Sequence, residues 1–166
     1  MLVKKEDLLS VDILPSPEEC NCFAVRAAAR HVTQSYDQFL APTGLRTTQF
    51  SILAKLKRKG PLTINALAED MLMDRTTLGR NVLPLERDGL IRVEPAASDR
   101  RAKDLHLTKA GEKRFLAALK RWSAAQARFD TVFGAKRGAD LRALLRAVVA
   151  SEFAPADHGG ALANNG

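Results

Sequence analysis

Cysteine, aromatic residues and long apolar runs are all scarce in this sequence of 166 residues. Its two cysteines cannot build a disulfide framework, and they favour a reducing compartment. No stretch of about 18 consecutive apolar residues occurs, so no membrane span is predicted. Acidic residues stand near the start, where a signal peptide needs an apolar stretch. These absences favour a cytoplasmic protein.

Residue patterns that support catalysis or metal binding are also missing. The three histidines are scattered, and none is spaced with Cys, Asp or Glu as a metal site requires. There is no glycine-rich phosphate loop, no nucleophile elbow and no acid pair with a supporting base. Aromatic residues make up 5% of the chain and form no stacking platform for RNA bases. The sequence therefore predicts neither an enzyme nor a cofactor or metal site.

Positive charge is what the chain has in excess. The net charge is +7 at pH 7, and the sequence pI is about 9.8. Residues 1–37 carry four basic and six acidic side chains, a net charge of −2, which leaves +9 for the rest. The basic residues form two clusters: Arg46, Lys55, Lys57, Arg58 and Lys59, and the stretch from Arg100 to Arg121. One interpretation is that each cluster is an ordinary solvated helix face. Because both clusters lie in the middle of the chain, a surface that binds a polyanion is favoured.

The apolar spacing predicts a mostly helical fold. A first amphipathic helix is expected over 18–40, and a second begins with Thr47 or Thr48 as its cap and ends at Lys59. Thr63 is expected to cap a short helix that ends near Met71. Asp74 is expected to cap the next helix, which ends at Asp88-Gly89. Two short helices joined by a tight turn are typical of a helix-turn-helix.

The only strong β pattern follows this motif. Residues 90–95 and 103–107 alternate apolar and polar side chains, and the polar loop between them contains Arg100 and Arg101. A helix-turn-helix followed by a hairpin with a basic tip is a winged helix. A long helix capped by Thr108 and closed by Gly134 follows, and a last helix is expected over about 139–152. The predicted fold is mainly α with a short β-hairpin wing.

The helix that Asp74 is expected to cap carries the side chains that a DNA recognition helix needs. Leu78 and Val82 are expected to face the core, which turns the polar residues outward. Arginine can bond guanine bidentately, asparagine can pair with adenine, and threonine offers a hydroxyl and a methyl group. The predicted major-groove residues are Arg75, Thr76, Thr77, Arg80 and Asn81. Arg100 or Arg101 is expected in the minor groove, with Lys103 beside them in the DNA-binding set. An ordinary exposed polar face is the alternative.

Four segments resemble the MarR family of bacterial transcriptional regulators. They are Leu62-Thr-Ile-Asn-Ala-Leu-Ala-Glu, Asp74-Arg-Thr-Thr-Leu, Leu85-Glu-Arg-Asp-Gly-Leu-Ile-Arg and Ser98-Asp-Arg-Arg-Ala-Lys-Asp-Leu-His-Leu-Thr-Lys-Ala-Gly111. The resemblance covers about residues 20–152. It implies a homodimer held by helices from both termini, a palindromic operator, and often a pocket for a small phenolic effector. The expected regions are an arm (1–17), dimerisation helices (18–46 and 108–153), the winged helix-turn-helix (47–107) and a disordered tail (154–166).

The cysteines resemble those of the family's organic-hydroperoxide-sensing branch. In that branch a cysteine placed like Cys22 is oxidised and a tyrosine, here Tyr36, bonds to it. The branch usually has a second tyrosine where this chain has Arg26, whose charge could instead stabilise a thiolate. Cys20 and Cys22 are too close for an easy mutual disulfide within a helix, so an intersubunit bond is the expected form. The alternative makes both cysteines ordinary residues of a buried dimer interface.

The sequence therefore predicts a sequence-specific, dimeric DNA-binding regulator, a repressor that a small-molecule effector releases. One alternative keeps this fold and makes cysteine oxidation by an organic hydroperoxide the signal. An alternative of another class is a winged helix that binds a protein partner through its basic face.

Overall fold

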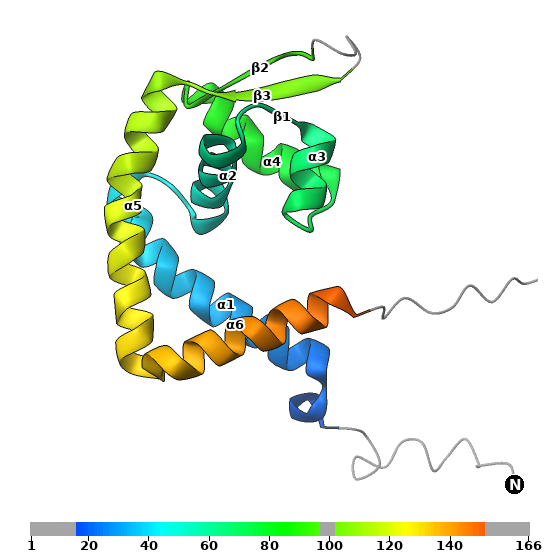
Figure 1. The fold of residues 1–166 in the computed structure, drawn as a ribbon, viewed down its shortest axis with the longest axis vertical. Helices are drawn as coiled ribbons and strands as arrows, with labels where there is room; N and C mark the ends of the chain where they lie inside the picture. Colours follow the sequence, from blue (N-terminus) through cyan, green and yellow to red (C-terminus); the bar gives the residue numbers. More distant parts are fainter. Residues whose placement is uncertain (1–15, 97–101, 152–166) are drawn as a thin grey trace, which may run out of the picture. The chain divides into compact units, whose positions relative to one another are not determined.

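The computed structural model describes residues 16–96 and 102–151, which form two compact units that divide after Ala125. The first unit holds the helix-turn-helix, a small sheet and most of a long helix (Figure 1). The second holds the last turn of that helix and the final helix. The predicted fold class, mainly α with a β wing, is confirmed. The predicted arm and tail lie almost wholly outside the described residues.

The first helix begins later than predicted. α1 spans Asn21–Leu40, and a short 3-10 turn, η3 (Pro17–Glu19), precedes it. Cys20 separates the two because its backbone is extended, with φ −79° and ψ 115°. A second 3-10 turn, η4 (Ala41–Thr43), follows α1 and ends at Gly44, whose φ of 73° favours glycine.

The cap of the second helix was predicted wrongly. α2 spans Thr47–Lys59, so Thr47 is its first residue and Arg46 occupies the N-cap position. The carboxylate of Asp37 in α1 accepts hydrogen bonds from the Thr47 backbone N–H at 2.7 Å and from Thr47 Oγ1 at 2.8 Å. A residue distant in sequence therefore supplies the acceptor that a local cap normally provides.

The short helices and the hairpin follow the predicted order. α3 spans Ile64–Asp70 and α4 spans Arg75–Arg87, and both have the predicted caps, Thr63 and Asp74. β2 (Ile91–Pro95) and β3 (Lys103–Leu107) pair antiparallel, with Val93 opposite Leu105. A third strand, β1 (Leu62–Thr63), was not predicted; it pairs with the other edge of β3, with Leu62 opposite Leu105. Two residues are too few to show the alternation that marks a strand.

The core of the first unit lies between α2 and the elements that surround it. Its largest fully buried side chains are all aliphatic: Leu40, Ile52, Leu53, Leu56, Leu67, Leu78, Leu85 and Leu105. α5 (Lys109–Phe129) joins this core through Phe115, whose ring stacks on that of Phe50 with centroids 5.4 Å apart. The Thr108 hydroxyl accepts from the Gly111 N–H at 3.0 Å, which confirms the predicted cap of the long helix.

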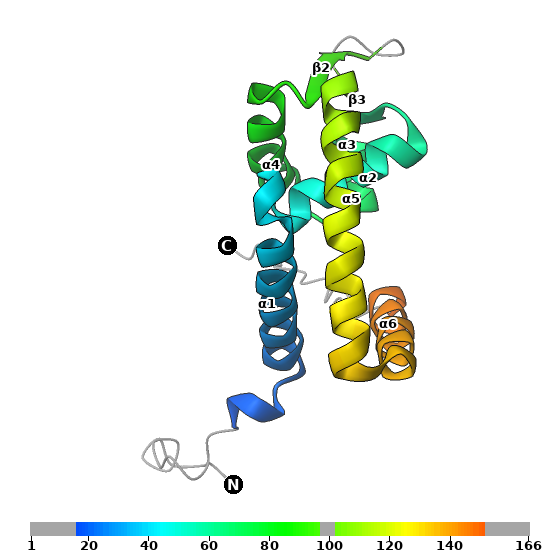
Figure 2. The same ribbon diagram turned by 90° about the vertical axis from the view of Figure 1, so that its left-hand side faces the viewer.

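Gly111 allows the first turn of α5 to lie directly against the start of the hairpin. A Cβ atom at this position would stand 1.9 Å from the Leu90 carbonyl oxygen. Figure 2 shows the strands at the end of the unit where α5 begins. Because only a hydrogen side chain fits there, this glycine sets how closely the wing and α5 pack.

The second unit departs from the predicted boundaries. α5 ends at Phe129, a π-helical segment, η5 (Asp130–Gly134), follows, and α6 spans Ala135–Ala150, a start about four residues earlier than predicted. Gly134 does break the helix as expected, with φ 96°. The rings of Phe129 and Phe133 lie 5.3 Å apart, and the Arg137 guanidinium lies 4.4 Å from the Phe133 centroid. These contacts hold η5 against α6.

Candidate nucleic-acid interface

Asp74 fixes the start of α4. Its carboxylate Oδ1 accepts a hydrogen bond from the Thr77 backbone N–H at 2.8 Å. Hydrogen bonds from the Thr77 side chain and backbone hold the pKa of Asp74 below its ordinary value of 3.8. The carboxylate is thus ionised near neutral pH and occupies the free N–H groups of the first turn. Because the start of α4 is fixed, the side chains that follow Asp74 project from the helix in defined directions.

The two faces of α4 differ sharply. Leu78, Val82 and Leu85 are buried in the core. Four of the predicted recognition residues are exposed: Arg75, Thr76, Thr77 and Arg80. At about 100° per residue, Thr76 and Arg80 lie opposite Leu78, whereas Arg75 lies only about 20° from the direction of Val82. The structure therefore places Thr76 and Arg80 together on one accessible face, with Arg75 and Thr77 on either side of it, and a duplex could reach this face without unfolding any part of the motif.

Asn81 lies away from the centre of that surface. It is half-buried, and its amide Nδ2 donates to the Thr77 carbonyl at 2.9 Å. At about 100° per residue, Asn81 lies about 140° round the helix from Thr76. One of its two amide hydrogens is already engaged within the helix, so pairing with adenine would require this bond to break or to be shared.

Gly79 lies in open space. No atom outside its own helical turn lies within 4 Å of the position a Cβ would take. The protein's own packing therefore gives no reason for a glycine here, where helix propensity favours alanine by about 1 kcal/mol. A close approach of another molecule to the α4 backbone would give one.

The wing carries the second group of predicted contacts. Lys103 is exposed at the start of β3, opposite Pro95 of β2. The Ala96 N–H donates to the Ala102 carbonyl at 2.9 Å and closes the hairpin below its tip. Arg100 and Arg101 lie outside the described residues, so their role remains a prediction.

All three lysines of α2 form ion pairs with two acidic residues from other elements. Lys55 and Lys59 both bind the Asp70 carboxylate, at 3.0 and 2.6 Å, and Lys57 pairs with Glu112. Hydrogen bonds from Lys59 and Lys55 hold the pKa of Asp70 below its ordinary value. The phosphate attraction predicted for this basic cluster is therefore weaker than the sequence indicated. The pairs instead connect α2 to α3 and α5.

The two cysteines lie at the start of α1. Both are exposed free thiols in the single chain, Cys20 at the N-cap and Cys22 at the second helical residue. The sequence predicted no easy disulfide between Cys20 and Cys22 because both were expected within one helix. Cys20 precedes the helix, so this reason does not apply. Arg26 is one turn beyond Cys22 and exposed, whereas Tyr36 is half-buried. Fourteen helical residues separate Cys22 from Tyr36, about 21 Å along the axis, so the two cannot touch within one chain.

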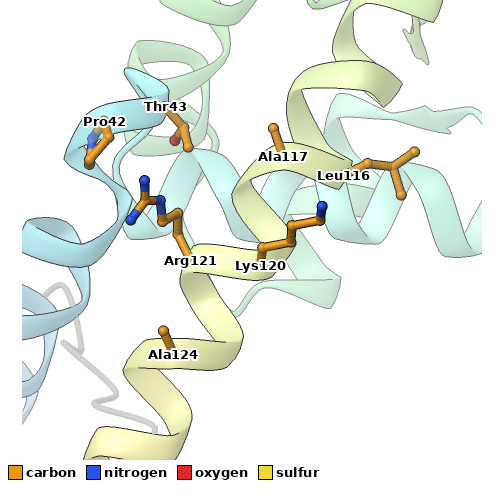
Figure 3. Close-up of a pocket in the computed structure, with 7 residues that line it drawn as sticks. All are labelled: Pro42, Thr43, Leu116, Ala117, Lys120, Arg121 and Ala124. Atoms are coloured by element: carbon orange, nitrogen blue, oxygen red, sulfur yellow. The ribbon is translucent and has the colours of Figure 1, made fainter.

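A cleft of about 650 Å³ lies between η4 and the outer face of α5 (Figure 3). This volume is within the range of small-molecule sites. Two cations, Lys120 and Arg121, stand among mainly small or apolar residues, and the Arg121 side chain is directed toward Pro42. The lining residues are Pro42, Thr43, Leu116, Ala117, Lys120, Arg121 and Ala124.

Exposed apolar side chains mark the terminal helices. In α1, Phe23 and Val25 are exposed; in α6, so are Leu144, Leu145, Val148 and Val149.

Within residues 16–96 and 102–151, no helix is long and apolar enough to cross a membrane. Over the same residues, no cluster of His, Cys, Asp or Glu could hold a metal ion.

Comparisons with known proteins agree on one family. The sequence profile of the MarR family matches residues 45–103. The Mycobacterium tuberculosis transcriptional regulator MosR is 36% identical, with a TM-score of 0.70 over 82% of this chain and 100% of that one. MosR in complex with DNA gives 38% identity and a TM-score of 0.69, over 80% of this chain and 98% of that one.

Two curated proteins of Bacillus subtilis (strain 168) are also similar. One is the organic hydroperoxide resistance transcriptional regulator, 28% identical over 54% of this chain and 61% of its own length. The other is the uncharacterized HTH-type transcriptional regulator YwoH, 29% identical over 55% of this chain and 66% of its own length. The chain thus spans less than two thirds of the curated relatives that it matches.

Proposed function

The chain belongs to the MarR family of transcriptional regulators, and we propose that it binds a palindromic operator as a homodimer and regulates transcription, as a repressor, in the cytoplasm. The observation that carries this proposal is the capped, exposed N-terminal half of α4. It has basic and hydroxyl side chains outside and only aliphatic ones inside. The role is one of binding, without a catalytic step. The 38% identity to MosR, whose structure includes DNA, supports it independently.

The proposed base contacts come from the outer face of α4. Arg80 bonds a guanine, Thr76 and Thr77 contact bases or phosphates, and Arg75 and Asn81 contact the flanks of the groove. The wing adds contacts to the minor groove and to phosphates through Arg100, Arg101 and Lys103. Two recognition helices in one dimer would lie about 34 Å apart, one turn of the duplex.

The homodimer is proposed from the exposed apolar side chains of α1 and α6. Side chains such as Phe23 and Leu144 form apolar faces that the described chain leaves in contact with water. Large apolar surfaces of this kind are typical of protein interfaces. In a two-fold symmetric dimer, the same apolar faces of both copies would be buried at the interface.

We propose that the signal is a small aromatic effector with a negative charge. The cleft between η4 and α5 supports this, because either Lys120 or Arg121 can bind a carboxylate while Leu116 contacts a ring. Binding would favour a dimer whose recognition helices no longer match the duplex spacing.

The test is a binding selection on sheared genomic duplex at physiological salt, followed by sequencing of the retained fragments. We expect an enriched inverted repeat with half-sites one turn apart. If the retained fragments share no sequence, the proposal is contradicted, and a basic surface that binds a protein partner is favoured instead.

Substitution of Arg80 tests its role on the selected operator. Arg80→Ala should weaken specific binding by about 1–3 kcal/mol and relax one operator position. Arg30→Ala, an exposed arginine of α1, is the matched control and should leave the preference unchanged. An Arg80→Ala variant with the original preference would exclude this base contact.

A redox signal at Cys22 is the second candidate. It is favoured by the exposed thiols at the start of α1 and by the likeness to an organic hydroperoxide resistance regulator. The Cys22 thiol would attack the peroxide, giving a sulfenic acid and releasing the alcohol. Hydroperoxide should then release operator from the wild type and from Cys20→Ser but not from Cys22→Ser. Release from all three would exclude Cys22 as the sensor.

A further inference from the structure

The centre of the polar face of α4 carries a large aliphatic side chain. Leu83 is 63% exposed. On a helix that already buries Leu78, Val82 and Leu85, a fourth large apolar residue would be expected in the core. Leu83 is instead exposed to solvent in the first unit, so its side chain is available to contact another molecule.

The helical phase places Leu83 among the proposed base-reading residues. At about 100° per residue, Arg80 lies about 40° to one side of Thr76, and Leu83 lies about 20° to the other. The buried Leu85 lies about 160° from Leu83, on the opposite face. Thr76, Arg80 and Leu83 thus form one stripe along the outside of α4.

The length of this stripe matches a short run of base pairs. Seven residues separate Thr76 from Leu83, about 10.5 Å along the helix axis, which corresponds to roughly three base-pair steps. Recognition helices that lie along a groove contact bases at this i, i+4, i+7 spacing. A helix with Thr76 and Arg80 in the groove would hold Leu83 over the next base pairs.

We propose that Leu83 reads thymine by packing against its C5-methyl group in the major groove. This methyl is the only apolar group that any base presents there, so it is the natural partner of an aliphatic side chain. Leu83 would therefore determine specificity at one position of each half-site, beside the guanine read by Arg80. The inference rests on the proposed operator binding and adds a residue to it.

The test removes the thymine C5-methyl group and the Leu83 side chain separately. Each thymine of the selected operator is replaced in turn by deoxyuridine, in both half-sites, and binding is measured for the wild type and for Leu83→Ala. For the wild type, we expect one symmetric replacement to weaken binding about fourfold for each half-site, as burial of one methyl group predicts. Leu83→Ala should bind the normal operator more weakly and show no further loss at that replacement.

Leu72→Ala is the matched control. Leu72 is 72% exposed in the turn before α4, so this variant removes an exposed leucine of the same motif from outside the stripe. It should respond to every deoxyuridine as the wild type does. Thermal unfolding of Leu83→Ala should match the wild type, because the side chain is exposed.

The proposal is overturned if Leu83→Ala and the wild type lose equal affinity at every thymine, or if no replacement weakens the wild type. Neither result would affect operator binding itself, which the binding selection measures separately. A protein that retained no specific duplex would instead contradict the proposed function.

Discussion

The winged helix and the terminal helices bury their side chains to very different extents. α2 buries four of its 13 residues, and all four are large and apolar. α1 buries only Leu40 among 20 residues, and α6 buries only Gly138 among 16. The winged helix thus has a core of its own, whereas α1 and α6 each leave most of their side chains uncovered within the described chain. This difference is what the proposed homodimer explains.

The largest expected effect comes from a cavity in the core of the winged helix. Leu53 is fully buried, so Leu53→Ala should lower the free energy of unfolding by about 2–5 kcal/mol. Leu116→Ala, at a half-exposed position of α5, should change it by less than about 1 kcal/mol. Urea unfolding measures both values, and similar losses would contradict the contrast between core and surface.

Gly111 and Gly79 provide a second contrast within the winged-helix unit. Gly111→Ala should destabilise the fold by about 1–3 kcal/mol, because its methyl group would collide with the Leu90 carbonyl oxygen. Gly79→Ala should stabilise α4 by up to about 1 kcal/mol, since its surroundings are open. Thermal unfolding compares the two variants, and a Gly111→Ala protein as stable as the wild type would show that α5 and the hairpin can separate freely.

Asp37 tests the connection between α1 and the winged helix. Partial burial would raise the pKa of Asp37, but hydrogen bonds from Thr47 and Arg46 outweigh it and hold the pKa below 3.8. Ionised Asp37 therefore stabilises the fold above this value, and the contribution is lost as the pH falls through the lowered pKa.

Asp37→Asn should lower the free energy of unfolding by about 1–2 kcal/mol at neutral pH, because the amide is a weaker acceptor than the carboxylate. The difference from the wild type should shrink in acid below pH 3.8, where both side chains become uncharged. Urea unfolding across this range measures it. A difference that stayed constant with pH would exclude an electrostatic origin.

The smallest expected effect concerns the exposed face of α6. Leu144→Ala should leave the melting of the winged helix unchanged and raise the dissociation constant of the homodimer roughly fivefold, or about 1 kcal/mol. Sedimentation at several concentrations measures it. Lys136→Ala, an exposed residue near the start of the same helix, is the control. A dimer of unchanged affinity in Leu144→Ala would place the interface elsewhere.

Local patterns predicted most of the DNA-binding region. The caps at Thr63, Asp74 and Thr108 depend on residues three positions away, so the sequence alone reveals them. The buried and exposed faces of α4 follow from the helical period in the same way. The exposed Leu83 was not foreseen, although the same period places it opposite the core.

The amino-acid sequence by itself determined the helices, the hairpin, the exposed basic residues of α4 and the family, because these depend on short-range spacing and on recognisable motifs. Only the tertiary structure decided that Asp37 caps α2, that β1 joins the sheet and that the lysines of α2 form ion pairs with acidic residues. Each of these contacts joins residues that are distant in the sequence. Their formation depends on how the helices pack, which no local pattern records.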